Sequence, residues 1–302
     1  MTAAAARIAF DCHAHVFETV AAVGRPRYLP RRPAPLTAWT TLLDAHGLAG
    51  GVLVQPSFLG TDNRQLLAAL ARLPAGRFAG VAVVELGVAS GELADLAEAG
   101  VRGLRWNLVE GAPLPDPDAP AVCRFLEQLG MAGLHLELHL EGPRLAGYLP
   151  RLAPRVWRLV IDHGGLPDAA DPADDAGLHA ITSLAGKGRL WVKLSAPYRS
   201  AARPSHVRAL LAALGPERLV WGSDWPWTRH ESGRDYARLL ALPATAGVPA
   251  AALNGAAVSL YRLAGGLARD AGRLTLDVAG RDAVQEGLPA LPGQVRQDDI
   301  VG

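Results

Sequence analysis

The sequence predicts a (β/α)8 barrel, and two observations carry that prediction. Eight short apolar runs, rich in Val, Leu, Ile and Trp, alternate with segments of helical length, over about 260 residues, the size and rhythm typical of this fold. Each run ends near Gly, Pro, Ser or Asp, as strands commonly do. The competing architecture is an open doubly wound sheet. Its nucleotide-binding versions lose support because the chain has no G-x-G-x-x-G after the first run and no G-x-x-x-x-G-K-[ST].

The strands and helices can be placed along the chain from these patterns. The predicted strands are 7–17, 51–57, 78–85, 101–108, 134–140, 158–165, 189–195 and 218–224. The clearest helical patterns are 36–48, 62–73 and 90–100. Asp62 opens the second of these helices as a candidate N-cap, and Gly100 is placed to end the third.

The chain changes character near residue 265. Residues 1–264 hold the whole strand and helix alternation and are expected to form the barrel. The segment 265–302 has scattered Gly, Pro and charge, and only 273–278 is strand-like. We therefore expect a C-terminal tail that is packed on the surface or partly disordered.

Composition excludes several classes of partner. Thirty basic residues against 29 acidic ones give no field that favours nucleic acid or an anionic membrane. The two cysteines have no paired spacing, which suits a reducing cytosol, and the first residues lack the basic lead of a secretory signal, so a cytoplasmic location is expected. The sequence has no run of about 18 apolar residues, so no membrane span is predicted. Nothing in the sequence predicts an oligomeric state.

The first strand carries an unusual pair of histidines in the stretch "DCHAHVF". His13 and His15 share parity, so both are predicted to point into the barrel, with Cys12 and Ala14 on the other side. Both also lie at the carboxyl end of the strand, where barrel active sites form. Two inward imidazoles suit a cation, although a pair of histidines satisfied by hydrogen bonds in the core would give the same pattern.

Three further titratable residues are predicted at the same rim. His139 ends the fifth strand, His163 the sixth and Asp224 the eighth. Buried titratable groups are costly unless they are paired or bind a metal. Their convergence with the two histidines of the first strand therefore favours a functional site over chance placement in the core.

Several segments of the sequence resemble a known protein family. "DCHAHVF", "IDHGGLP" and "GSDWPW" resemble the amidohydrolase superfamily, and the nearest resemblance is to its lactone-hydrolase branch, which includes the 2-pyrone-4,6-dicarboxylate lactonases. Four further blocks read like that branch: 52–63, 101–107, 191–195 and 254–263, the last resembling the closing helix. The resemblance covers about residues 8 to 263, and it implies the same barrel fold.

The resemblance also implies catalytic roles. Asp224 would be the general base that activates water, and His163 would polarise the scissile carbonyl or stabilise its oxyanion. His13 and His15 would hold a divalent metal in metal-using relatives. Lactonases of this branch are thought to work without a tightly bound metal, so the pair would then assist the carbonyl electrostatically. Ring opening needs water activation, oxyanion stabilisation and a proton for the leaving oxygen, which a carboxylate and imidazoles can supply.

Cofactor use is left with two alternatives. Either none is required, or one divalent metal is bound, zinc or manganese, by His13, His15, His139 and Asp224. The substrate-binding residues implied by the resemblance, or by their place at the rim, are Arg105, Tyr28, Ser57, His139 and Arg199. Guanidinium suits a carboxylate through its bidentate fork, so the expected partner is a small carboxylated molecule.

Two departures from the family pattern bear on the substrate. Relatives carry a second arginine just past the fourth strand, where residues 108–117 have Glu110 and no arginine. His139 stands where a tyrosine is expected. A second substrate carboxylate would therefore face Glu110 or depend on Arg199, so a lactone with a single carboxylate is expected to be preferred.

Three functions are compatible with these residues. The first is hydrolysis of a carboxylated lactone with Asp224 as general base. The second is metal-dependent decarboxylation in the same superfamily, with His13, His15, His139 and Asp224 as ligands and His163 as the acid. The third is a barrel that binds a small ligand without catalysis, which has no need of a buried base.

Overall fold

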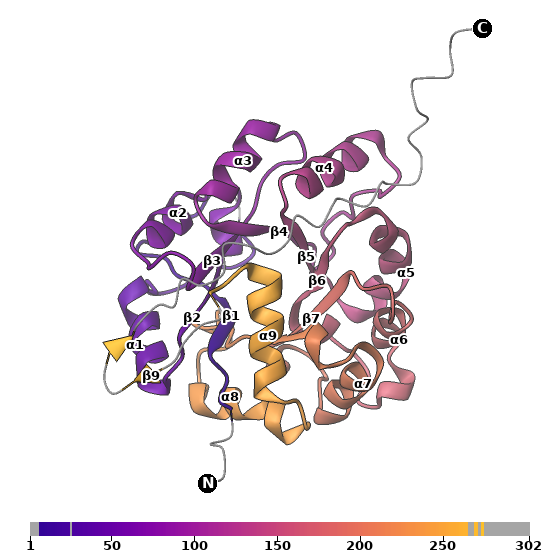
Figure 1. Cartoon of the computed structure of the whole chain (residues 1–302). Coiled ribbons are helices and arrows are strands. Elements are labelled where there is room, and N and C mark those ends of the chain that lie inside the picture. Colours follow the sequence, from indigo (N-terminus) through magenta and orange to yellow (C-terminus); the bar gives the residue numbers. More distant parts are fainter. Residues whose placement is uncertain (1–5, 25, 265–268, 271–272, 275–302) are drawn as a thin grey trace, which may run out of the picture. The chain divides into compact units, whose positions relative to one another are not determined.

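The barrel prediction is confirmed by the computed structural model, which describes residues 6–24, 26–264, 269–270 and 273–274. Eight parallel strands form one sheet in the order β1 to β8, with helices packed around it (Figure 1). The seam between first and last strands is joined by backbone hydrogen bonds, from Asp224 N–H to His13 C=O at 2.8 Å and from His15 N–H to Trp225 C=O at 2.7 Å. The seam therefore joins the two segments that carry the predicted site.

The elements follow the predicted alternation. The strands are β1 (Phe10–Ala14), β2 (Gly50–Val54), β3 (Phe78–Ala82), β4 (Val101–Asn107), β5 (His135–His139), β6 (Leu159–Ile161), β7 (Leu190–Leu194) and β8 (Leu219–Trp221). The helices are α1 (Leu36–His46), α2 (Arg64–Ala71), α3 (Ser90–Glu98), α4 (Pro120–Met131), α5 (Gly142–Leu152), α6 (Ala176–Thr182), α7 (Pro204–Leu214), α8 (Tyr236–Thr245) and α9 (Ala250–Tyr261).

Several predicted boundaries are wrong. β6 and β8 are three residues long, because the chain turns immediately after them to present His163 and Asp224. α2 begins at Arg64 rather than at Asp62. The Asp62 carboxylate instead accepts hydrogen bonds from the backbone N–H and guanidinium of Arg64. Gly100 does follow α3, with a φ of 96° that favours glycine.

The expected alternation of β1 also breaks. The pairing of β1 with β2 shifts register between Asp11 and Ala14. Asp11 faces outward and accepts from Trp39 Nε1 of α1 at 3.0 Å. Cys12 packs in an inner apolar cluster with Val160 of β6 and Tyr261 of α9, so the prediction that it shares the side of Ala14 is wrong. The irregularity lets Cys12 and His13, which are consecutive, both face the barrel interior.

The two ends of the barrel differ. α9 packs Ala256, Leu260 and Tyr261 into the inner cluster, and it crosses in front of the strands (Figure 1). Asn254 of α9 accepts from the N–H of Ala9, just before β1 begins, at 2.8 Å. The helix thus lies near the amino end of β1, and the carboxyl ends of the strands carry the polar residues.

The chain separates into two compact units, Met1–Gly265 and Gly266–Gly302. In the second unit β9 (Arg269–Asp270) pairs antiparallel with β10 (Arg273–Leu274). The remainder of the strand-like stretch 273–278, and the rest of the predicted tail, lie outside the described residues.

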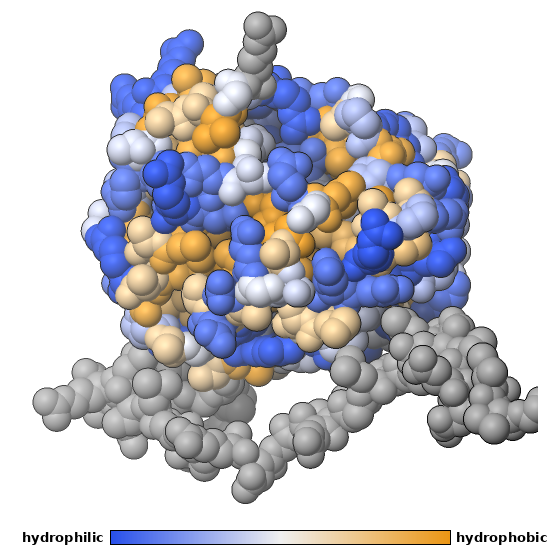
Figure 2. Space-filling view, turned by 90° about the horizontal axis from the view of Figure 1, so that it is seen from above, coloured by the Kyte–Doolittle hydropathy of each residue, from blue (hydrophilic) through white to orange (hydrophobic). Residues whose placement is uncertain are grey.

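None of the described helices alone is long and apolar enough to span a membrane. The pair α8 and α9 meets that test by length and composition, but the two helices are bent by 105° at their break. Hydrophobic residues gather in the middle of the face seen in Figure 2, with hydrophilic ones around them.

Candidate active site

Asp224 lies at the centre of the candidate site. Its Oδ1 atom is 3.7 Å from His13 Nε2, 3.8 Å from His15 Nε2 and 3.9 Å from His163 Nε2. All four side chains are buried. The structure therefore brings together the four residues that the sequence predicted to be catalytic.

The separations around Asp224 are longer than direct hydrogen bonds. Asp224 Oδ1 and His13 Nε2 are both buried and have no hydrogen-bond partner in the described part of the chain. Buried polar atoms are nearly always satisfied, and polar separations above about 3.5 Å are commonly bridged by water. The geometry suits a water or substrate oxygen held between the carboxylate and the imidazoles.

The backbone at two of these residues is unusual. Asp224 has a φ of 59° and His163 a φ of 53°, in the left-handed region that non-glycine residues seldom adopt. Each residue follows a three-residue strand, and the turn swings its side chain over the barrel interior. Such conformations cluster at functional sites, where the surrounding structure stabilises them.

The other oxygen of Asp224 is firmly held. Oδ2 accepts from Arg199 Nε at 2.7 Å and from the Tyr198 hydroxyl at 2.6 Å. Burial alone would raise the pKa of Asp224, but Arg199 and the neighbouring histidines hold it well below its usual range. Burial and Asp224 raise the pKa of Tyr198, so the phenol stays a donor. Tyr198, in "SAPYRS", was not singled out from the sequence.

Three imidazoles of the site, those of His13, His139 and His163, have lowered pKa values and are neutral at pH 7. Burial, reinforced by Lys193, lowers the pKa of His13 to about 3. Burial also lowers the pKa of His163 well below its usual range, and His163 Nδ1 lies 2.8 Å from Ser195 Oγ. The pKa of His139 is lowered in the same direction by burial and by Arg105. Neutral imidazoles can donate or accept, depending on the tautomer.

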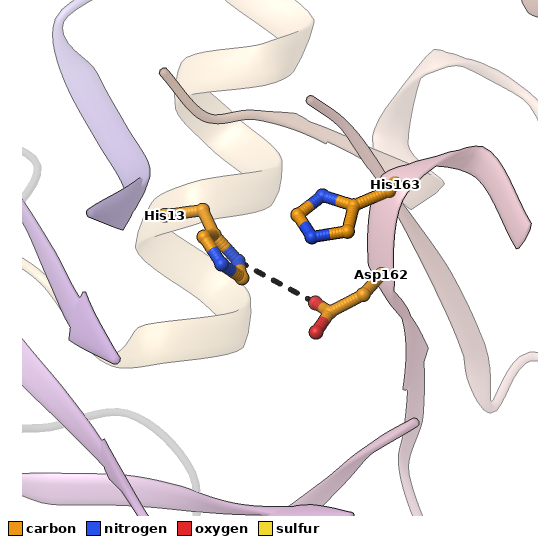
Figure 3. Close-up of side chains that lie close together, drawn as sticks. All are labelled: His13, Asp162 and His163. Carbon is orange, nitrogen blue, oxygen red and sulfur yellow. Dashed lines mark ion pairs between the residues drawn. The ribbon is translucent and has the colours of Figure 1, made fainter. Parts of the chain in front are cut away.

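A set of buried charges lies beneath the histidines, and sequence reasoning missed it. Lys193 Nζ is 2.5 Å from Glu137 Oε2 and 3.3 Å from Asp162 Oδ1, and all three side chains have no exposed surface. Figure 3 shows Asp162 and His163 projecting from consecutive positions toward His13, whose Nδ1 lies 3.5 Å from Asp162 Oδ1, an ion pair only when His13 is protonated. The only signal in the sequence is a charged residue inside a strand, between apolar neighbours, as in "LWVKL" and "HLELH".

Two groups of residues satisfy the distances of a metal site. They are His13, His15 and Asp224, and His13, Asp162 and His163. His139, the fourth predicted ligand, belongs to neither group; its Nδ1 lies 2.9 Å from Arg105 Nη2.

The hydrogen bonds behind the histidines test whether that donor set fits a metal. Metal-binding histidines almost always donate the other ring N–H to a carboxylate, carbonyl or water. His15 fits, since its Nδ1 lies 2.7 Å from Val54 C=O. His13 does not, because its Nδ1 meets the Lys193 ammonium at 3.1 Å. The donor set therefore does not fit a metal at His13.

A pocket opens beside Asp224. It is lined by all five predicted substrate-binding residues, namely Tyr28, Ser57, Arg105, His139 and Arg199, and by Arg27 and Arg229. The last two were missed because they lie in loops far apart in the chain. The Arg229 guanidinium pairs with the carboxylate of Glu110. Arg27 Nη2 donates to Asn107 Oδ1 at 2.9 Å, and its Nε is 4.0 Å from Glu110.

Four of the five predicted substrate-binding residues, all except Ser57, are already engaged within the protein. Arg105 is buried, and its Nε donates to Asp162 Oδ2 at 2.8 Å while Nη2 contacts His139. Arg199 is paired with Asp224, and the Tyr28 hydroxyl donates to Glu231 at 2.8 Å. Of the arginines lining the pocket, Arg27 has the loosest pairing with a carboxylate.

Comparison with known proteins identifies the family of this chain. The profile of the amidohydrolase family matches residues 10–263. The chain belongs to the amidohydrolase family. The matched range runs from β1 through α9, so it contains every residue of the site described above.

Named relatives and solved structures share much of the chain. A 4-sulfomuconolactone hydrolase of Rhizobium radiobacter is 28% identical over 235 residues, covering 72% of this chain and 75% of that protein. A 2-pyrone-4,6-dicarboxylate hydrolase of Comamonas testosteroni is 29% identical over 240 residues, covering 72% and 76%. A crystal structure of a probable 2-pyrone-4,6-dicarboxylic acid hydrolase from Acinetobacter baumannii, with citric acid bound, has a TM-score of 0.76 and 32% identity, covering 85% of this chain and 100% of that chain.

Proposed function

We propose that this protein hydrolyses a carboxylated lactone by attack of water on the ring ester, with Asp224 as general base. The observation that carries the proposal is that Asp224 Oδ1 has no hydrogen-bond partner among the described residues. It is surrounded by the Nε2 atoms of three histidines beside an arginine-lined pocket. Membership of the amidohydrolase family, and two relatives named as lactone hydrolases, support it.

The chemistry follows from the positions of the side chains. Asp224 Oδ1 accepts a proton from a water held among the three imidazoles, and the hydroxide attacks the lactone carbonyl carbon. The carbonyl oxygen becomes an oxyanion, which imidazole N–H groups from His13 or His163 stabilise. When the ring C–O bond breaks, the leaving oxygen takes the proton held by Asp224, and the product is an open-chain hydroxy acid or its keto tautomer.

The charges lining the pocket indicate what the substrate carries. Four arginines line it; Asp162 pairs with Arg105, Asp224 with Arg199, and Glu110 with Arg229. Arg27 remains; its guanidinium donates to Asn107 Oδ1 and Val109 C=O, and its only carboxylate contact among the described residues is the loose one to Glu110. From the sequence, a second carboxylate was expected to face Glu110 or to depend on Arg199. The structure adds two arginines, Arg27 and Arg229, to those that line the pocket.

Three of the four pocket arginines are paired with carboxylates of the protein, so one guanidinium is left to pair with one substrate carboxylate. We therefore keep the preference for a monocarboxylated lactone and transfer the carboxylate partner from Arg105 to Arg27. A carboxylate in the pocket without a cationic partner is disfavoured, because Glu110 also lines the pocket and repels it.

A panel of lactones with no, one or two carboxylates tests the function, with each assay run with and without a chelator. Steady ring opening of a carboxylated lactone that survives the chelator is expected, and Asp224→Asn should abolish it. Release of CO2 from an aromatic or muconate-like acid, dependent on added Zn²⁺, would instead establish the decarboxylase alternative. Binding of carboxylated lactones without turnover would leave the non-catalytic barrel.

A further inference from the structure

Lys193 is the most deeply enclosed cation in the described part of the barrel that touches the site. Its side chain has no exposed surface. Its Nζ atom meets three acceptors: Glu137 Oε2 at 2.5 Å, His13 Nδ1 at 3.1 Å and Asp162 Oδ1 at 3.3 Å. An ammonium group has three N–H donors and no acceptor. Two of these contacts, to Glu137 and His13, are hydrogen bonds, and the third, to Asp162 Oδ1, is an ion pair without hydrogen-bond geometry.

This arrangement decides which nitrogen of His13 carries the proton. An N–H of Lys193 can approach Nδ1 at 3.1 Å favourably only if Nδ1 presents a lone pair. In a neutral imidazole the proton then sits on Nε2. The opposite tautomer would donate from Nδ1 to Asp162 across 3.5 Å, and it would leave a Lys193 N–H facing another N–H. That costs a buried hydrogen bond and adds repulsion.

His15 is held in the opposite way. Its Nδ1 lies 2.7 Å from Val54 C=O, and a carbonyl can only accept, so Nδ1 carries the proton. In the neutral form of the His15 imidazole the lone pair is then on Nε2. The two histidines of the H-x-H pair face Asp224 Oδ1 at similar distances, one through an N–H and the other through a lone pair.

We infer that Lys193 is a positioning residue that holds His13 with Nε2–H directed at the reaction centre, and so converts a potential metal ligand into a hydrogen-bond donor. The catalytic consequence rests on the proposed function: the donor would serve the attacking water or the carbonyl oxygen beside Asp224. The effect on a cation does not rest on it. A metal needs the lone pair of His13 Nε2, and the ammonium behind Nδ1 adds like charge close to the ion.

The tautomer can be read directly in the full-length protein. Long-range ¹H–¹⁵N correlation of histidine-labelled protein separates a protonated from a bare ring nitrogen, and His13→Gln identifies the His13 signals among the nine histidines. We expect His13 protonated on Nε2 and His15 on Nδ1. A wild-type spectrum with His13 protonated on Nδ1 overturns the inference, and it does so whether or not any lactone is hydrolysed.

A paired substitution tests the role of Lys193 while keeping the buried charge balanced. Lys193→Met combined with Glu137→Gln removes one cation and one anion and leaves Asp162 with Arg105. His13 Nδ1 is then free to carry the proton and donate it to Asp162, 3.5 Å away, so that Nε2 presents a lone pair. This is the carboxylate–histidine arrangement of metal sites, so Zn²⁺ should bind about tenfold to a hundredfold more tightly than to wild type.

The control is Tyr261→Phe, which removes the 3.0 Å hydrogen bond to Glu137 Oε1 and keeps Lys193. Titration calorimetry with Zn²⁺, and the visible spectrum with Co²⁺, compare the three proteins. The control should keep the wild-type tautomer and the wild-type affinity for Zn²⁺. Equal affinity in all three proteins, or an unchanged His13 tautomer in the paired variant, overturns the inference. If the paired variant does not fold, the wild-type spectrum decides.

Discussion

Arg199 should control the pH at which the site becomes competent. Its Nε lies 2.7 Å from Asp224 Oδ2, and Asp224 is 1% exposed. Two opposite charges about 4 Å apart attract by about 4 kcal/mol at an effective dielectric constant of 20, and such a neighbour lowers a carboxyl pKa by about 1–3 units. Arg199→Met removes that attraction while keeping much of the side-chain length.

The substitution Arg199→Met should raise the pKa of Asp224. Without the guanidinium the protonated form of Asp224 becomes easier to reach, so its pKa rises. The acidic limb of kcat/KM should move to higher pH by about 1–3 units. Stability should follow the same direction. A carboxylate with a depressed native pKa stabilises the fold above its unfolded pKa, and that stabilisation fades as the pH falls through the native value. The variant should therefore unfold at higher pH than wild type on acidification.

The assay is the pH profile of kcat/KM for whichever lactone is turned over, together with acid unfolding followed by circular dichroism. Arg229→Met is the matched control, because it removes a guanidinium from the same pocket that does not contact Asp224. It should change KM and leave the acidic limb in place. An acidic limb that does not move in Arg199→Met would show that Arg199 does not set the protonation of the base.

Three further predictions follow from the same geometry. Asp224→Asn should fold normally and lose several orders of magnitude in kcat; more than about a tenth of wild-type turnover would remove Asp224 as the base. Arg27→Met should raise KM for a carboxylated lactone about tenfold or more with little change in kcat, and an equal rise for an uncharged lactone would contradict the pairing with a carboxylate. Deleting 268–302 should leave a folded and active barrel, because Met1–Gly265 is a compact unit by itself; loss of soluble protein would refute this.

The barrel and the central residues of its site could be predicted from the sequence because both depend on short-range periodicity. Parallel strands in a barrel present their carboxyl ends to one rim, so residues such as His15, His163 and Asp224 converge wherever the intervening helices run. The H-x-H spacing needs only the two-residue repeat of a strand. Even here the register shift in β1 changed the side on which Cys12 lies, since a bulge depends on pairing with β2 and not on local pattern.

Only the tertiary structure decided how the charges around Asp224 are paired. Lys193 and Glu137 lie on β7 and β5, 56 residues apart, and each has apolar residues on both sides in its strand. Arg27 and Arg229 enter the same pocket from loops after β1 and β8. The physical reason is that periodicity fixes the face of a strand on which a side chain lies, whereas the partner of a buried charge depends on distances across the closed barrel. Those distances determine which arginine can meet a substrate and which nitrogen of His13 carries its proton.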